Sequence, residues 1–152
     1  MCHRIEYFLE GERVLVYFDA AHAELPVRKR SGAIEFVTWG ARGERYLSDD
    51  NTPGYLLKFP VGGWAAGVHT CRRVGKVQPR PVRIVASRFV FNHAQLGPLF
   101  FALGRGEYIQ GLLAQAALQR RVYVVTVPAP PEHADRLDEW PRVIKSRHRV
   151  RP

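Results

Sequence analysis

The sequence predicts a single α+β domain in which a mixed, mostly antiparallel β-sheet is accompanied by one main helix. The length of 152 residues suits one domain. Runs rich in β-branched and aromatic residues recur along the chain and predict strands. Only the segment 106–119 places apolar residues at helical spacing. We expect the domain to cover residues 1–144, and the basic segment 145–152 to be a disordered tail because it is too polar to pack.

The first third of the chain predicts two strands and a long loop. Residues 13–18 are rich in β-branched and aromatic side chains, and residues 33–39 follow the turn signal Ser31-Gly32. Together the two strands predict a hairpin or a meander. Glycine, proline and Asp-Asp-Asn then punctuate residues 40–63, so we expect a long loop that is functional or mobile.

The second half is more regular. Residues 81–91 and 98–103 predict strands, and the short apolar run 122–127 predicts a buried central strand. Between them, one apolar helical face predicts the main helix near 106–119, and it consists of Tyr108, Ile109, Leu112, Leu113 and Ala116. A short helical turn through 132–139 and a last strand at 142–144 complete the prediction.

The positive charge is unevenly distributed. The net charge is +9, and residues 51–106 contain eight Lys or Arg but no Asp or Glu. A positive face attracts polyanions because each neutralised phosphate releases a counterion. The pattern therefore favours nucleic acid as a partner. The alternative is an arginine-rich composition that reflects only a GC-rich genome.

Arginines and tryptophans in or beside the acid-free segment are candidate contacts for nucleic acid. Arg72 and Arg73 are the best candidates for phosphates, and their alternative is a solvated pair of charges. An exposed Trp39 or Trp64 would offer a base a stacking platform worth about 1–3 kcal/mol, whereas the alternative is a core anchor. The full set of candidate DNA-binding residues is Arg4, Trp39, Trp64, Arg72, Arg73, Arg83 and Arg88.

Several functional classes have no signature in the sequence. There is no P-loop, no dinucleotide-binding glycine fingerprint, no Cys-x-x-Cys pair and no Gly-x-Ser-x-Gly elbow. We therefore expect no cofactor and no metal. No apolar run reaches the roughly 18 residues that span a membrane, and no secretory signal begins the sequence. Two cysteines do not form a disulfide framework, which predicts a reducing cytoplasm.

Cys2 directly follows Met1, and removal of Met1 would leave a cysteine at the N-terminus. An α-amine has a pKa near 8, so a useful fraction is neutral at pH 7 and could condense with an aldehyde. The thiol of the same residue could then close a thiazolidine ring. The alternative is that Cys2 is a small hydrophobic residue of the first strand.

The order of several short motifs resembles the SOS response-associated peptidase (SRAP) family. The chain begins Met1-Cys2-His3-Arg4 where that family begins Met-Cys-Gly-Arg, and Phe36 to Gly40 resembles its strand ending in Trp-Gly. Three later segments match its order of elements, namely Arg83 to Asn92, the apolar strand Val122 to Val127, and Leu137 to Pro141. The resemblance covers nearly the whole chain but contains few identities.

The resemblance implies binding of single-stranded DNA and covalent capture of abasic sites by the N-terminal cysteine. In that family an Asn, a Glu and a His assist the cysteine. Here those positions fall on Ala65, Phe91 and Leu137. Four polar residues nearby in the sequence could substitute, and they are His69, Asn92, His93 and His133.

Two functions follow as expectations. The first is a single-stranded DNA-binding protein of SRAP type that crosslinks abasic sites through Cys2 after self-processing. The second is a catalytically inactive SRAP-like module that binds nucleic acid or a protein partner. A peptidase acting on another protein is a minor third. None of the three requires a membrane or a small-molecule cofactor.

Overall fold

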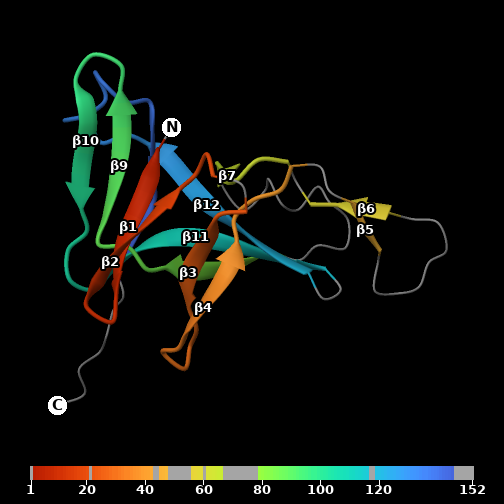
Figure 1. Ribbon diagram of the computed structural model, residues 1–152. Helices are drawn as coiled ribbons and strands as arrows, with labels where there is room; N and C mark the ends of the chain where they lie inside the picture. The colour runs from red at the N-terminus through yellow and green to blue at the C-terminus, as the bar shows by residue number, and fades with distance from the viewer. Residues whose placement is uncertain are drawn as a thin grey trace.

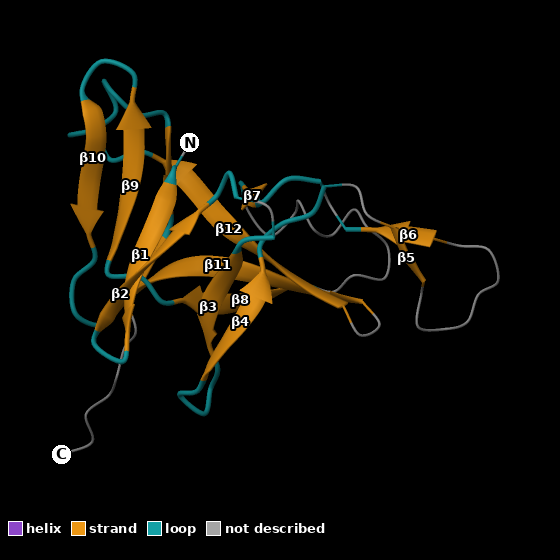
Figure 2. Ribbon diagram, in the orientation of Figure 1, coloured by secondary structure: helices purple, strands orange, loops and turns teal. Residues whose placement is uncertain are grey.

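The protein is an all-β structure. The computed structural model describes residues 2–20, 22–42, 45–47, 56–59, 61–66, 79–116 and 119–145. Throughout these residues the regular elements are strands, and none forms a helix (Figures 1 and 2). The predicted α+β class is therefore wrong. The described residues also contain no helix that could cross a membrane.

The predicted helix near 106–119 is instead the strand β11 (Glu107–Ala116) and the start of β12 (Gln119–Pro128). Residues 109–114 are all buried, because β11 is central in its sheet and covered on both faces. A strand that is buried on both faces has apolar residues at nearly every position. Some of these residues therefore also fall at the three- and four-residue spacing of an apolar helical face. Gly111 packs against the side chains of Ile84 and Val122. A Cβ added at Gly111 would lie only 2.8 Å from the Ile84 side chain, so this position has no room for a larger residue.

Sheet A has four antiparallel strands in the order β10-β9-β1-β2. They are β1 (Arg4–Leu9), β2 (Glu12–Tyr17), β9 (Arg88–His93) and β10 (Gly97–Ala102). Glu10 and Gly11 join β1 to β2 with φ values of 51° and 80°. Positive φ at both central residues defines a turn type whose twist matches the twist of the two flanking strands. This turn fixes the register of β1 against β2.

Sheet B follows the order β13-β12-β11-β8-β3-β4, with β14 paired to β11 and β7 paired to β12. Its other strands are β3 (Glu24–Arg28), β4 (Ile34–Thr38), β7 (Trp64–Ala65), β8 (Arg80–Ile84), β13 (Glu139–Pro141) and β14 (Val143–Lys145). A bridge between Trp39 and Val122 brings the end of β4 back to β12, so the sheet curls toward a barrel. A separate pair joins β5 (Arg45–Leu47) and β6 (Leu56–Lys58).

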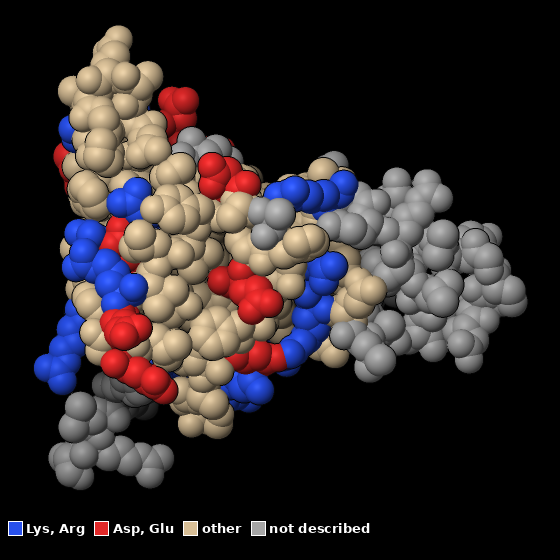
Figure 3. All heavy atoms as spheres, in the orientation of Figure 1, with Lys and Arg blue, Asp and Glu red and all other residues tan. Residues whose placement is uncertain are grey.

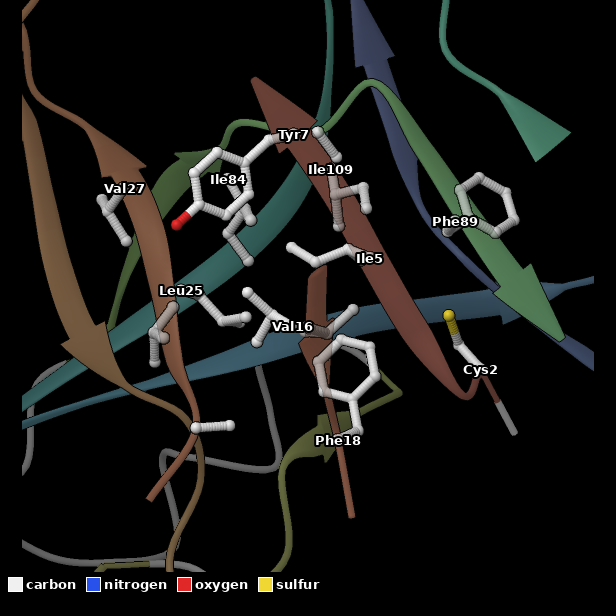
Figure 4. Packing of buried hydrophobic residues seen from close by; sticks show 14 of the residues in the cluster. Cys2, Ile5, Tyr7, Val16, Phe18, Leu25, Val27, Ile84, Phe89 and Ile109 are labelled. Carbon is white, nitrogen blue, oxygen red and sulfur yellow. The ribbon is translucent and has the colours of Figure 1, made fainter. Parts of the chain in front are cut away.

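The main hydrophobic core lies between the inner faces of the two sheets. Figure 4 shows Ile5 and Val16 of sheet A pointing toward Leu25, Ile84 and Ile109 of sheet B. A second cluster covers part of the opposite face of sheet B, and it comprises Ala41, Phe59, Ala65, Leu112, Ala114, Tyr123 and Val125. Sheet B is therefore buried on both faces over this part, whereas the outer face of sheet A has no such cover among the described residues.

The strands expected at 13–18, 33–39, 98–103, 122–127 and 142–144 are confirmed as β2, β4, β10, β12 and β14. The hairpin or meander expected from the first two is wrong, because β2 pairs with β1 in sheet A and β4 pairs with β3 in sheet B. The segment 81–91 contains two strands rather than one. At 85–87 the chain crosses between the sheets, since Val85 N–H donates to Pro26 O of sheet B and Ser87 N–H to Glu6 O of sheet A.

Two further expectations concern the last third of the chain. The helical turn expected through 132–139 is a series of turns over residues 131–136, followed by β13. The predicted tail begins at Lys145, the last residue of β14, and the rest of it lies outside the described residues.

Candidate nucleic-acid interface

Cys2, the predicted nucleophile, lies in the main core. Its side chain is 5% exposed and packs in the cluster with Ile5, Phe18 and Phe89 (Figure 4). The thiol donates toward two backbone carbonyls, Arg4 O at 3.4 Å and Val90 O at 3.6 Å. Burial raises the pKa of the Cys2 thiol to about 12, so it is protonated at neutral pH. Within the described residues, neither a carboxylate nor an imidazole hydrogen bonds to it.

The three candidate substitute helpers that the structure describes, Asn92, His93 and His133, make no hydrogen bond to the Cys2 thiol. Asn92 and His93 line a cleft of about 530 Å³ together with part of the 131–139 segment. His93 Nδ1 accepts hydrogen bonds from two backbone N–H groups of the β9–β10 turn, at 3.2 and 3.1 Å. His133 stacks on Trp140 with 5.4 Å between ring centroids. His69 lies outside the described residues.

Trp39 and Trp64 are half-buried anchors at the seam where β4 meets β12. Their rings lie 5.4 Å apart, and each lies 4.8 Å from the ring of Phe18. Trp39 Nε1–H donates to Gly63 O at 2.9 Å. Both rings pack against the main core and against each other, as the core-anchor alternative predicts.

The candidate arginines are divided between two surfaces. Arg4 and Arg88 meet on the outer face of sheet A, whereas Arg83 lies on β8 of sheet B. Arg72 and Arg73 lie outside the described residues. The structure thus brings together two arginines that are 84 positions apart in sequence.

The outer face of sheet A carries alternate residues of its four strands, because successive side chains of a strand point to opposite sides. The register aligns Phe100, Val90, Arg4 and Tyr17 in one row across the sheet. The next rows complete the face, which comprises Arg4, Glu6, Phe8, Arg13, Leu15, Tyr17, Arg88, Val90, Asn92, Pro98, Phe100 and Ala102. Figure 3 shows blue and red atoms close together at the left of the view, in the region of β1 and β2.

Glu6 lies at the centre of this face and is 0% exposed. Arg88 Nε and Nη2 both lie 2.7 Å from Glu6 Oε1, and Arg4 Nε lies 3.0 Å from Oε2. Arg13 Nε is farther, at 3.7 Å. Burial would raise the pKa of the Glu6 carboxyl, but the bonds from Arg88 and Arg4 outweigh it and lower that pKa. Three guanidinium groups around one carboxylate leave an excess of positive charge.

Exposed aromatic rings border the charged centre. Phe8, Phe100 and Tyr17 are 55%, 48% and 38% exposed. Arg88 Cζ lies 4.6 Å from the Phe100 ring centroid, and Arg4 Cζ lies 5.6 Å from both Phe100 and Tyr17. The face therefore combines flat apolar surface with fixed guanidinium groups, which suits a ligand that has rings and negative charges.

Comparison with known proteins finds no match. No protein-family model, no curated protein and no solved structure is similar to this chain. The resemblance to SRAP proteins therefore stays a prediction. Within the described ranges, no group of three or more His, Cys, Asp or Glu side chains is placed to hold a metal ion.

Sequence reasoning missed five functional residues of this face: Glu6, Phe8, Arg13, Tyr17 and Phe100. The strand predicted at 98–103 contained part of the signal, because neighbouring side chains of a strand point to opposite faces, so Phe100 and Phe101 were bound to lie on different sides of the sheet. The partners of Phe100 could not be found in this way, because they come from β1 and β9 across the sheet.

Proposed function

We propose that this protein binds single-stranded nucleic acid, without covalent chemistry, through the outer face of sheet A. The observation that carries the proposal is the set of exposed rings, each beside an arginine, on a sheet face with no cover among the described residues. The resemblance to SRAP proteins favours DNA as the strand.

The rings would supply stacking. Phe100 and Tyr17 belong to the same row, with β9 and β1 between them. Arg4 Cζ lies 5.6 Å from the centroid of each ring, so the two centroids are at most twice that distance apart, a span that about two stacked nucleotides can bridge. A duplex keeps its bases stacked and cannot present them to a sheet, so a single strand fits this surface better.

The arginines would supply phosphate contacts. Arg4 and Arg88 use their Nε groups on Glu6, which fixes the planes of their guanidinium groups and leaves further N–H groups for a ligand. Arg13 is half-exposed and lies 5.5 Å from the ring of Phe8. Glu6 thus serves as a buried anchor that pre-organises positive charge.

The geometry of Cys2 supports binding without covalent capture. Thiazolidine formation needs the thiol as well as the freed α-amine, and the thiol is 5% exposed in the main core and protonated at neutral pH. The rings of His93 and His133 have other partners in the structure, and Asn92 lines the cleft beside the 131–139 segment. The predicted reducing cytoplasm would keep the thiol free in either case.

Fluorescence anisotropy with a labelled single-stranded DNA oligonucleotide tests the proposal. Replacing Phe100 by Ala removes one stacking platform, so binding should weaken about 5- to 150-fold, the equivalent of 1–3 kcal/mol. Phe36→Ala is the matched control, because Phe36 is 42% exposed on β4 of the other sheet. Its affinity should stay within about twofold of the parent's.

A salt titration separates nucleic acid from the rival occupant, a protein partner. Binding through phosphates should give a linear fall of log K against log salt with a slope of several ion equivalents. No detectable binding at about 50 mM salt, or equal losses in Phe100→Ala and Phe36→Ala, would refute the proposal. If no binding of the oligonucleotide is detected, a protein partner becomes the better proposal for the ligand of this face.

A further inference from the structure

Two arginines converge on one tyrosine on the outer face of sheet B, away from the interface proposed above. Arg28 of β3 lies directly opposite Arg83 of β8. Their guanidinium carbons lie 5.8 and 5.7 Å from the centroid of the Tyr108 ring on β11. Arg83 is in turn directly opposite Gln110 of β11, so the four side chains form one continuous patch.

A third arginine joins this patch from the link between β13 and β14. Arg142 Nη1 donates a hydrogen bond to Gln110 Oε1, and the backbone N–H of Gln110 donates to Arg142 O at 2.8 Å. Gln110 itself is 9% exposed. Gln110 thus links Arg142 to the patch, since Gln110 lies directly opposite Arg83. We call Arg28, Arg83, Tyr108, Gln110 and Arg142 the Tyr108 cluster.

The charge of the Tyr108 cluster is not compensated by the described part of the chain. There, no ion pair involves Arg28, Arg83 or Arg142. Ile34 of β4 lies directly opposite Arg28, and the next residue along β4 is Glu35. The carboxylate of Glu35 is already paired with Lys29 and Arg120. Like charges directly opposite each other on neighbouring strands destabilise a sheet. The contact between Arg28 and Arg83 therefore destabilises the sheet, and no acidic side chain among the described residues offsets this repulsion.

Arg28 also has a donor with no acceptor. Its Nε is buried and makes no hydrogen bond, although Nη1 donates to Gly32 O at 3.3 Å. A buried donor that is left unpaired carries a desolvation penalty. An anion with several acceptor oxygens, held by the guanidinium groups of the cluster, would offset the like-charge contact between Arg28 and Arg83.

We propose that the Tyr108 cluster binds a phosphate group. A phosphate monoester or inorganic phosphate offers up to two negative charges and three or four oxygens in a tetrahedral array. That array can accept hydrogen bonds from guanidinium groups that come from two strands and the β13–β14 link, whereas a carboxylate offers only one negative charge and two oxygens to three arginines. Tyr108 fixes two of the guanidinium groups in place by cation–π contact.

Thermal unfolding in sodium phosphate and in sodium chloride of equal ionic strength tests this site. A ligand that binds only the folded state raises the melting temperature, so phosphate should stabilise the parent more than chloride does. Arg83→Gln should reduce this difference to the general effect of a salt excluded from the protein surface, and weaken phosphate binding by about tenfold or more. In chloride the same variant should melt at or above the parent's temperature, because the like-charge contact with Arg28 is gone.

The control is Arg30→Gln, which removes the same charge from the exposed β3–β4 turn. It should keep the full phosphate effect. The site is refuted if phosphate stabilises Arg83→Gln as much as the parent, or if both variants lose the effect equally. It is also refuted if Arg83→Gln melts clearly below the parent in chloride, since Arg83 would then have a structural role.

Two oligonucleotides identify where the phosphate comes from. One carries a 5′-phosphate and the other a 5′-hydroxyl, with the same sequence. If the phosphate is the end of a DNA strand, the 5′-phosphate should tighten binding to the parent but not to Arg83→Gln. If the two oligonucleotides bind alike while inorganic phosphate still stabilises the parent, the ligand is a small phosphate compound. Phe100→Ala weakens both oligonucleotides equally, so failure of this site and failure of the proposed function give different results.

Discussion

The buried carboxylate of Glu6 provides the sharpest test of the interface, and the perturbation is Glu6→Gln. Glutamine keeps the shape of the side chain but removes the negative charge among three guanidinium groups. The variant loses the charge of two close ion pairs, to Arg88 at 2.7 Å and to Arg4 at 3.0 Å. Hydrogen bonds to charged groups contribute about 1.5–3 kcal/mol each, and breaking a buried ion pair costs about 3–5 kcal/mol.

We therefore expect Glu6→Gln to lower the free energy of unfolding by about 3 kcal/mol at pH 7, because the glutamine oxygen still accepts one hydrogen bond. Urea denaturation followed by tryptophan fluorescence measures this change. The matched control is Glu12→Gln, since Glu12 is exposed on β2 of the same sheet. The control should change the free energy of unfolding by less than about 0.5 kcal/mol.

The pH dependence has a defined sign. The pKa of Glu6 is lowered by folding from its ordinary value of 4.5, so its contribution to stability is complete above pH 4.5. That contribution is lost as the pH falls through the lowered folded pKa. The gap between the parent and Glu6→Gln should consequently narrow in acid. A loss below about 1 kcal/mol at pH 7, or a gap that stays constant down to the acid transition, would refute the role of Glu6 as an ionised anchor.

Three further predictions follow from the core and the thiol. In a Cys71→Ser background, the Cys2 thiol should react with a thiol reagent far more slowly in the folded protein than in urea, because it is buried and protonated; equal rates would contradict its placement. An oligonucleotide with one abasic site should give no heat-stable adduct on a denaturing gel, with the state of Met1 checked by mass spectrometry. An adduct that is absent in Cys2→Ala would instead restore the covalent function. Gly111→Ala should destabilise the fold by about 1–3 kcal/mol in urea titrations, because its Cβ would lie 2.8 Å from Ile84; wild-type stability would exclude this contact.

Local composition predicted many of the strands, and the reason is physical. The runs at 13–18 and 122–127 combine β-branched and aromatic residues, which fit a pleated surface whatever their partners are. Both became strands in the structure, β2 and β12. The same reasoning failed at 106–119, because a strand buried on both faces lacks the alternation that distinguishes it from a helix. Gly111, a poor helix residue, was the local signal for the correct answer.

The interface could be predicted only in part. The charge distribution pointed to a polyanion, and the candidate list included Arg4 and Arg88. It did not show that these two arginines share one buried carboxylate, or that Trp39 and Trp64 pack against Phe18 rather than face a ligand. Burial of a tryptophan depends on which strands meet at its position, and the chain near Trp39 gives no information about β12.

By itself, then, the sequence determined where strands can form, how the charge is distributed and which residue types are available for chemistry. The tertiary structure decided which of these side chains meet. Pairing of β1 with β9 placed Arg88 against Glu6, and pairing of β3 with β8 placed Arg28 opposite Arg83. Each pair joins residues more than 50 positions apart, and a shift of one residue in either register would turn one partner to the other face of its sheet. Strand register is set by the packing of the whole core, which is why both surfaces became visible only in the folded chain.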